Sequence, residues 1–340
     1  MVIIHKDTLE QKINTFMQDN HITRLKKDPT ETFQKQIQKA LQTCNSLTEK
    51  NRLKHLINVK PNVPNLNAYT KTHKEGAPIR AVINSLHAPS HKIAKLLNKK
   101  LLNLVNLPNT FITKNSLEVA QDLHSIQLNG NNRMISLDIK DLYVNLPTKN
   151  ILHTTAFWLS RNNNDQVIID QTLHLLKTTL GQNYFQHNNQ FYQLDKGITM
   201  GSPISSTLAE IYLQYLEEEY IKHCLEHKDI VYYRRYVDDL LIIYDQSRIK
   251  VDKILNFISN VDARLEFNLS QEAENTLQYL DLSIRRNDNN IELDIYRKQT
   301  YADIMMHYTS NHPHDHNLAA FIFYTNRMIT MPITCQAISR

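Results

Sequence analysis

The chain has 340 residues, of which 41% are hydrophobic and 21% charged, with a net charge of +5. This composition is that of a globular protein with two or three subdomains, and it excludes a low-complexity chain. The modest positive charge is compatible with a polyanionic partner. The three cysteines lie far apart, so we expect neither a disulfide framework nor a zinc knuckle, and a reducing compartment fits best. Neither a signal peptide nor an apolar run long enough for a membrane span is evident, so we expect no membrane partner.

The first third of the chain is predicted to be mainly helical. Residues 1–60 are rich in Lys, Gln, Asn and Thr with sparse leucines, which indicates a helical extension. Residues 66–85 are expected to be extended and to contain a short strand that carries Arg80. Apolar residues then recur at helical spacing, which predicts helices at 89–105 and from Asn115 onward.

Two later segments place three aspartates at the ends of strands. The segment RMISLDIK, residues 133–140, predicts a short buried strand with Asp138 near its end. The segment IVYYRRYVDDLLIIY, residues 230–244, reads as two β-rich runs around an Asp-Asp pair. This pattern predicts a tight hairpin with Asp238 and Asp239 at its tip.

The remaining segments are predicted from their periodicity and turn residues. GITMGSP, residues 197–203, holds two of the five glycines of the chain and predicts a turn. Between this turn and the strand of Asp138 we expect a variable helical stretch. Further helices are expected at 205–225, 247–261 and 318–329. Two more strands are expected at 277–284 and 291–296, with NDNN as the turn between them.

Antiparallel pairing of the two Asp-bearing elements would bring three carboxylates together. Such a cluster repels itself unless cations neutralise it. Magnesium prefers hard oxygen ligands and keeps positions for phosphate oxygens, and two such ions can promote phosphoryl transfer. An Asp-Asp pair alone is most often ordinary turn chemistry. The order strand-Asp, glycine turn, helix, Asp-Asp hairpin, helix and strands favours the layout of a polymerase palm.

These motifs resemble those of reverse transcriptases, most closely those of Penelope-like retroelements. The resemblance covers roughly residues 60–330. It rests on SLDIKDLYVNLP, GITMGSPISSTLAEIYL and YVDD as palm motifs, on KTHKEGAPIRAVINS as a finger segment, on QYLDLSIRR and YRKQT as the following strands, and on SNHPHDH with a later arginine as a tail.

The resemblance implies an α+β right-hand polymerase fold with fingers, palm, a partial thumb and an N-terminal helical extension. The implied domains are the extension at 1–65, fingers and palm at 66–300, and a thumb or thumb fragment at 301–340. The palm is expected mainly at 131–147 and 197–300.

The resemblance also implies roles for individual residues. Asp138 and Asp238 would be the principal ligands of two Mg²⁺ ions, with Mn²⁺ as an alternative, and Asp239 an auxiliary ligand. Tyr143 would be the steric gate that excludes a ribose 2′-hydroxyl, so the substrate would be a dNTP. Arg80 would bind the incoming triphosphate, because a guanidinium can donate two hydrogen bonds to phosphate.

The resemblance implies nucleotide or nucleic-acid contacts for six further residues. Lys71 and Lys74 would support nucleotide binding, Gly201 would let the backbone approach the nucleotide, and Met200 would shape the floor beside the templating pair. Primer phosphates would be contacted by Arg234 and Arg235. No lysine is assigned as the general acid for pyrophosphate, and the His-rich 312–316 segment is not expected to bind metal.

The function implied by the resemblance is RNA-directed DNA polymerisation. The enzyme, a nucleotidyltransferase, would extend a DNA or RNA primer on an RNA template. It would be intracellular, and nuclear if it comes from a eukaryotic retroelement. One alternative is an RNA-dependent RNA polymerase, which usually has Gly-Asp-Asp at the hairpin. The other is a non-catalytic nucleic-acid-binding relic of a retroelement.

Overall fold

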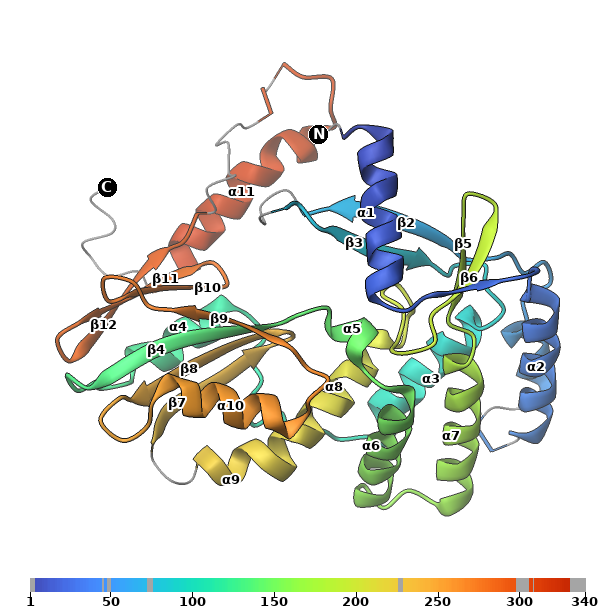
Figure 1. The fold of residues 1–340 in the computed structure, drawn as a ribbon, viewed down its shortest axis with the longest axis horizontal. Helices are drawn as coiled ribbons and strands as arrows, with labels where there is room; N and C mark the ends of the chain where they lie inside the picture. Colours follow the sequence, from blue (N-terminus) through green and yellow to red (C-terminus); the bar gives the residue numbers. More distant parts are fainter. Residues whose placement is uncertain are drawn as a thin grey trace. The chain divides into compact units, whose positions relative to one another are not determined.

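The computed structural model describes residues 4–44, 46–47, 50–71, 76–225, 229–297, 306–307 and 309–330. It contains two compact units, each built from two segments of the chain (Figure 1). The first unit comprises Met1–Asn109 and Asp141–Glu219, and the second comprises Thr110–Lys140 and Tyr220–Arg340. The finger, palm and thumb boundaries given above stay a proposal.

The N-terminal part of the first unit is mainly helical, as predicted for residues 1–60. Its elements are α1 (Lys6–Asp19), β1 (Thr23–Leu25), α2 (Thr30–Thr43) and the 3₁₀ helix η1 (Lys50–Leu56). Ile13 and Met17 of α1 pack in one apolar cluster with Ile79, Ile83 and Phe185. The three-residue strand β1 was not predicted, and it pairs antiparallel with β6 (Gln190–Gln193).

A five-stranded sheet in the order β1-β6-β5-β2-β3 forms the centre of the first unit. The strand expected to carry Arg80 is confirmed as β3 (Ile79–Asn84), which pairs antiparallel with β2 (Asn65–Thr70). The hairpin of β5 (Tyr184–His187) and β6 lies in the stretch predicted to be helical. Its strands have four residues each, too few for a clear period-2 pattern.

Helices make up the rest of the first unit. They are α3 (His91–Leu104), α5 (Leu142–Asn145), α6 (Thr148–Arg161), α7 (Gln166–Leu180) and α8 (Ser205–Leu216). The indole of Trp158 in α6 is 2% exposed and donates a 3.0 Å hydrogen bond to the carbonyl oxygen of Ile211 in α8. The helix predicted at 205–225 is confirmed, but a π-helical turn, η2 (Glu217–Ile221), separates α8 from α9 (Lys222–Leu225).

The second unit contains a four-stranded antiparallel sheet in the order β7-β8-β4-β9. Its strands are β4 (Asn132–Ile139), β7 (Ile230–Tyr236), β8 (Asp239–Asp245) and β9 (Phe267–Gln271). The predicted hairpin and the strand of Asp138 are thereby confirmed, whereas β9 was not predicted. Helices α4 (Ser116–His124) and α10 (Val251–Val261) belong to the same unit, and the Asn115 side chain caps α4 by accepting from the Glu118 amide at 3.0 Å.

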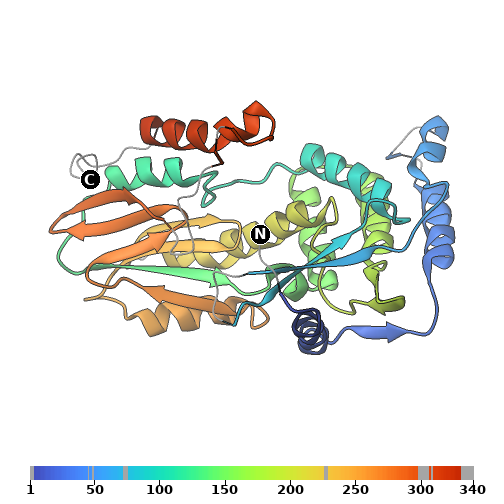
Figure 2. The ribbon, with the colours of Figure 1, turned by 90° about the horizontal axis from the view of Figure 1, so that it is seen from above.

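A three-stranded sheet of β10 (Thr276–Tyr279), β11 (Leu282–Asn287) and β12 (Asn290–Ile295) follows (Figure 2). The prediction of one strand at 277–284 was wrong, because a two-residue turn at Leu280 and Asp281 divides it into β10 and β11. Leu280 has a φ of +53°, which leucine seldom adopts, so the sequence gives no turn signal there. The expected NDNN turn is present, since Asn287 pairs with Asn290.

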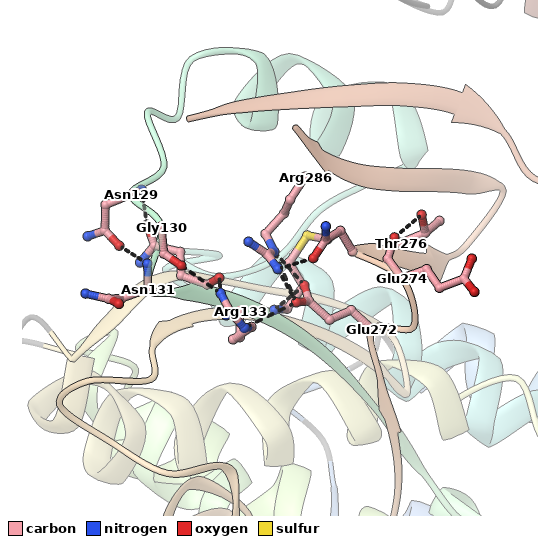
Figure 3. A network of polar contacts seen from close by, with 11 residues as sticks. Asn129, Gly130, Asn131, Arg133, Glu272, Glu274, Thr276 and Arg286 are labelled. Atoms are coloured by element: carbon pink, nitrogen blue, oxygen red, sulfur yellow. Dashed lines mark hydrogen bonds and ion pairs between the residues drawn. The ribbon is translucent and has the colours of Figure 1, made fainter. Parts of the chain in front are cut away.

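A buried ion network connects the two sheets of the second unit (Figure 3). The Glu272 carboxylate, which follows β9, accepts a 2.6 Å hydrogen bond from Arg286 Nη2 of β11 and lies 3.6 Å from Arg133 Nε of β4. It also accepts from the amide of Met134 at 3.1 Å. The side chains of Arg286 and Glu272 are only 8% and 10% exposed, so this ion pair is shielded from water.

The last described helix is α11 (His314–Thr330), which confirms and extends the helix predicted at 318–329. Its Arg327 donates to the backbone carbonyl of Asp281 at 2.9 Å and forms an ion pair with the Asp281 carboxylate at 2.5 Å. Within the described part of the chain, no helix has the length and apolar character needed to cross a membrane.

Candidate functional site

The second unit positions the three predicted aspartates at one end of its four-stranded sheet. Asp138, in β4, is the direct cross-strand partner of Asp239, the first residue of β8. The side chains of such a pair lie on the same face, with Cβ atoms about 4.5–5.5 Å apart. Asp238 lies in the turn before β8, and its carbonyl oxygen accepts from the amide of Ile139 at 2.9 Å. The strand register therefore places Asp138 opposite Asp239, with Asp238 beside them.

The donor set around Asp138 and Asp239 fits a hard cation. All three aspartates are half-buried, so each keeps part of its surface exposed to solvent. Asn268, the other cross-strand neighbour of Asp138, donates a hydrogen bond of 3.4 Å to its carboxylate. Among the described residues, no group of three or more His, Cys, Asp or Glu side chains is arranged to hold a metal ion. Mg²⁺ commonly uses only one or two protein carboxylates, with substrate phosphates completing its shell, and the facing pair is compatible with that.

The turn that carries Asp238 has a strained backbone. Tyr236 pairs with Asp239, which leaves Val237 and Asp238 as a two-residue turn. Val237 has a φ of +53°, a region that costs a β-branched residue energy. Turns of this length usually place Gly, Asn or Asp at such positions. Strain of this kind persists only where the surrounding contacts impose it.

Two consecutive arginines precede this turn and have different surroundings. The Arg234 Nε donates to the Asp122 carboxylate at 2.9 Å, and its side chain is 30% exposed. Arg235 is 1% exposed, and its guanidinium donates to the carbonyl oxygen of Val237 at 2.9 Å. A primer phosphate therefore cannot reach the Arg235 guanidinium in this conformation. The contact predicted for Arg234 stays a proposal.

In the first unit, Tyr143 lies on the short helix α5. Its hydroxyl oxygen is 3.5 Å from Ser206 Oγ in α8, and its carbonyl oxygen accepts from the amide of Ile198 at 2.8 Å. Gly197 has a φ of +77°, and a Cβ there would lie 2.1 Å from the Val144 carbonyl oxygen. Only glycine allows this close approach, so the GITMGSP segment packs directly against the helix that carries Tyr143.

The same segment is also bound to strand β3. The amide of Ile83 donates to the carbonyl oxygen of Met200 at 2.8 Å. A Cβ on Gly201, whose φ is +108°, would lie 2.4 Å from the Ile83 carbonyl oxygen. The missing side chain of Gly201 thus makes room for β3, and the predicted approach to a nucleotide stays a prediction.

The basic candidates of the first unit have different surroundings. Arg80 has an exposed side chain and lies three residues before Ile83 on the same strand. Lys71 follows β2, is half-buried, and donates from its amide to Pro78 at 2.8 Å. Lys74 lies outside the described residues. The nucleotide contacts expected of these residues stay predictions.

Tyr279 was not recognised from the sequence as a residue of this site. It ends β10, is 3% exposed, and its hydroxyl donates to the carbonyl oxygen of Asp239 at 3.0 Å. Burial raises its pKa well above the usual tyrosine range, and the negative charges of Asp239 and Asp238 raise it further. In the sequence, Tyr279 is one of several apolar residues in a predicted strand. No neighbouring residue indicates that its hydroxyl binds Asp239.

The chain has the right-hand polymerase fold, with mixed helices and sheets. Residues 72–279 match the reverse transcriptase (RNA-dependent DNA polymerase) family, so the chain belongs to this family. No curated protein matches the chain.

Two solved telomerase structures are similar in fold. Telomerase from Candida albicans in complex with a TWJ fragment of telomeric RNA gives a TM-score of 0.61 at 11% identity, covering 98% of this chain and 57% of that one. Apo telomerase from Candida tropicalis gives a TM-score of 0.58 at 11% identity, covering 85% and 53%. The chain thus spans little more than half the length of these structures.

Proposed function

We propose that this chain is an RNA-directed DNA polymerase of a Penelope-like retroelement. The observation that carries the proposal is the pairing of Asp138 with Asp239 beside Asp238, inside the segment that matches the reverse transcriptase family. Acidic side chains at one end of a sheet in a member of this family are well suited to nucleotidyl transfer. The retroelement origin rests on the sequence motifs, and an intracellular location, nuclear in a eukaryotic host, follows from that origin.

In the proposed reaction, the 3′-oxygen of a primer attacks the α-phosphorus of a dNTP. A new P–O bond forms, and the bond to pyrophosphate breaks. Two Mg²⁺ ions bound by Asp138, Asp238 and Asp239 would supply the positive charge that this transfer requires. Most of the catalytic effect would come from position and electrostatics, because phosphoryl transfer needs little covalent participation by the protein.

The remaining candidates would select and hold the nucleotide. The exposed guanidinium of Arg80 would donate to the triphosphate, with Lys71 and Lys74 as further cations. The ring of Tyr143, supported by Gly197 and α8, would occupy the volume of a ribose 2′-hydroxyl. An RNA template and a DNA or RNA primer would be bound through their backbones, with little dependence on sequence.

Primer extension on an RNA template tests this proposal against its alternatives. The full chain should extend a primer with dNTPs in the presence of Mg²⁺, and Asp138→Asn should abolish extension without loss of fold or template binding. Asp252→Asn, which changes an exposed carboxylate on α10, is the matched control and should extend normally. Extension with NTPs instead would favour an RNA polymerase. Binding of the primer–template without extension would favour a non-catalytic relic.

A further inference from the structure

The hydroxyl of Tyr279 connects the three-stranded sheet to the hairpin that carries the aspartates. Its oxygen lies 3.0 Å from the carbonyl oxygen of Asp239, to which it donates. The residue is 3% exposed, so water does not compete for this bond. The bond is made to the backbone of Asp239, the residue whose side chain faces Asp138.

This bond is made at the end of the strained turn that contains Val237 and Asp238. Tyr236 and Asp239 are the paired residues on either side of Val237 and Asp238. The Tyr279 hydroxyl also has a hydrogen bond with the backbone of Tyr236. It therefore contacts the main chain on both sides of the turn.

Tyr279 is itself held firmly in the second unit. It belongs to the buried cluster that includes Leu241, Leu277, Leu282 and Ile284. On its C-terminal side, the turn residue Asp281 is bound by Arg327 of α11 through both its backbone carbonyl and its carboxylate. A fixed donor of this kind can restrain the backbone of the hairpin that carries Asp238 and Asp239.

We infer that Tyr279 is a positioning residue: its hydroxyl fixes the backbone of Asp239 and thereby holds the Asp138–Asp239 carboxylate pair in the geometry that binds a divalent cation. This inference rests on the proposed function for the identity of the cation site. Tyr279 touches neither substrate nor metal in this role. It acts through the main chain of Asp239.

The test is Tyr279→Phe in the full chain, which removes the hydroxyl and keeps the ring. The matched control is Tyr232→Phe, since Tyr232 lies in the same buried cluster but donates to Asp122 at 3.1 Å. Amide hydrogen exchange of the 236–241 peptide is measured with and without Mg²⁺. A typical hydrogen bond corresponds to a change of about threefold to tenfold in an equilibrium constant.

We expect exchange of this peptide to accelerate by about that factor in Tyr279→Phe and not in Tyr232→Phe. The Mg²⁺ concentration that slows the exchange half-maximally should rise several-fold in Tyr279→Phe alone. Equal exchange in the two variants would overturn the inference. Faster exchange with an unchanged Mg²⁺ response would also overturn it, because the bond would then be merely structural. Primer extension by the wild-type chain is measured separately and tests the proposed function. A failure of the proposed function can therefore be distinguished from a failure of the inference about Tyr279.

Discussion

The guanidinium of Arg235 donates a 2.9 Å hydrogen bond to the carbonyl oxygen of Val237, two residues further along the hairpin. Arg235 is 1% exposed, and its backbone is also bonded on both sides, to Phe111 at 2.8 Å and to Thr113 at 3.0 Å. A buried guanidinium is stable only when it is well hydrogen-bonded. Arg235 therefore holds the backbone of the turn in which Asp238 lies.

Arg235→Met should destabilise the protein by about 2 kcal/mol, because the half-buried Val237 carbonyl loses its donor. Urea denaturation followed by circular dichroism measures this change. Arg234→Met is the control, since its partly exposed ion pair with Asp122 should contribute no more than about 1 kcal/mol. Equal losses of stability in Arg235→Met and Arg234→Met would contradict the structural role of Arg235.

Val237→Gly should leave stability unchanged or raise it by up to about 1 kcal/mol, because glycine adopts a positive φ without steric cost. The relief is partly offset by the greater backbone entropy that glycine loses on folding. Val82→Gly in strand β3 is the matched control and should be destabilising, since the structure records no positive φ there. A clear loss of stability in Val237→Gly would show that the valine side chain matters more than the strain.

The sequence predicts the elements of the aspartate site but not their register. Apolar, β-rich runs in 133–140 and 230–244 indicate one strand and a two-stranded hairpin, and all three strands are present. A period-2 pattern does not specify which residue of one strand faces which residue of the other. The pairing of Asp138 with Asp239 therefore had to come from the structure.

Two kinds of feature could not be predicted from the sequence: contacts between distant segments, and turns with an unusual backbone conformation. Tyr279 and Asp239 are 40 residues apart, and their hydrogen bond leaves no local pattern. Val237 and Leu280 both adopt a positive φ although neither residue type signals a turn. The burial of Arg235 was missed for a similar reason, because an arginine in a strand is usually solvent-exposed.

Gly197→Ala should destabilise the protein by several kcal/mol. The new Cβ would lie 2.1 Å from the Val144 carbonyl oxygen, and alanine would be strained at a φ of +77°. Because the atoms that the Cβ would meet are all backbone atoms of Val144, the clash can be relieved only by moving α5 or the 197–203 segment. Gly130→Ala is the matched control, since no atom lies within 4 Å of a Cβ there. Thermal unfolding of the two variants should differ by several degrees, and equal melting temperatures would contradict the close packing of Gly197 on α5.

Glu272→Gln should cost about 3 kcal/mol, because the buried guanidinium of Arg286 would lose its counter-charge. Glu274→Gln is the control two residues away, where the side chain is exposed (Figure 3). It should change stability by less than about 0.5 kcal/mol. Urea denaturation of both variants is the measurement. A small effect of Glu272→Gln would mean that the network between the two sheets contributes little to the fold.

Tyr143→Val should raise incorporation of ribonucleotides relative to deoxyribonucleotides by at least about tenfold, equivalent to roughly 1.4 kcal/mol of discrimination. A phenol ring rejects the 2′-hydroxyl by collision, and valine leaves that volume open. Tyr143→Phe is the matched control, because it keeps the ring and removes only the hydroxyl near Ser206. Competition between dGTP and GTP on one RNA template gives the ratio directly. An unchanged ratio in Tyr143→Val would mean that another residue excludes the ribose 2′-hydroxyl. An equal shift in Tyr143→Phe would mean that the hydroxyl of Tyr143, and not its ring, discriminates between the sugars.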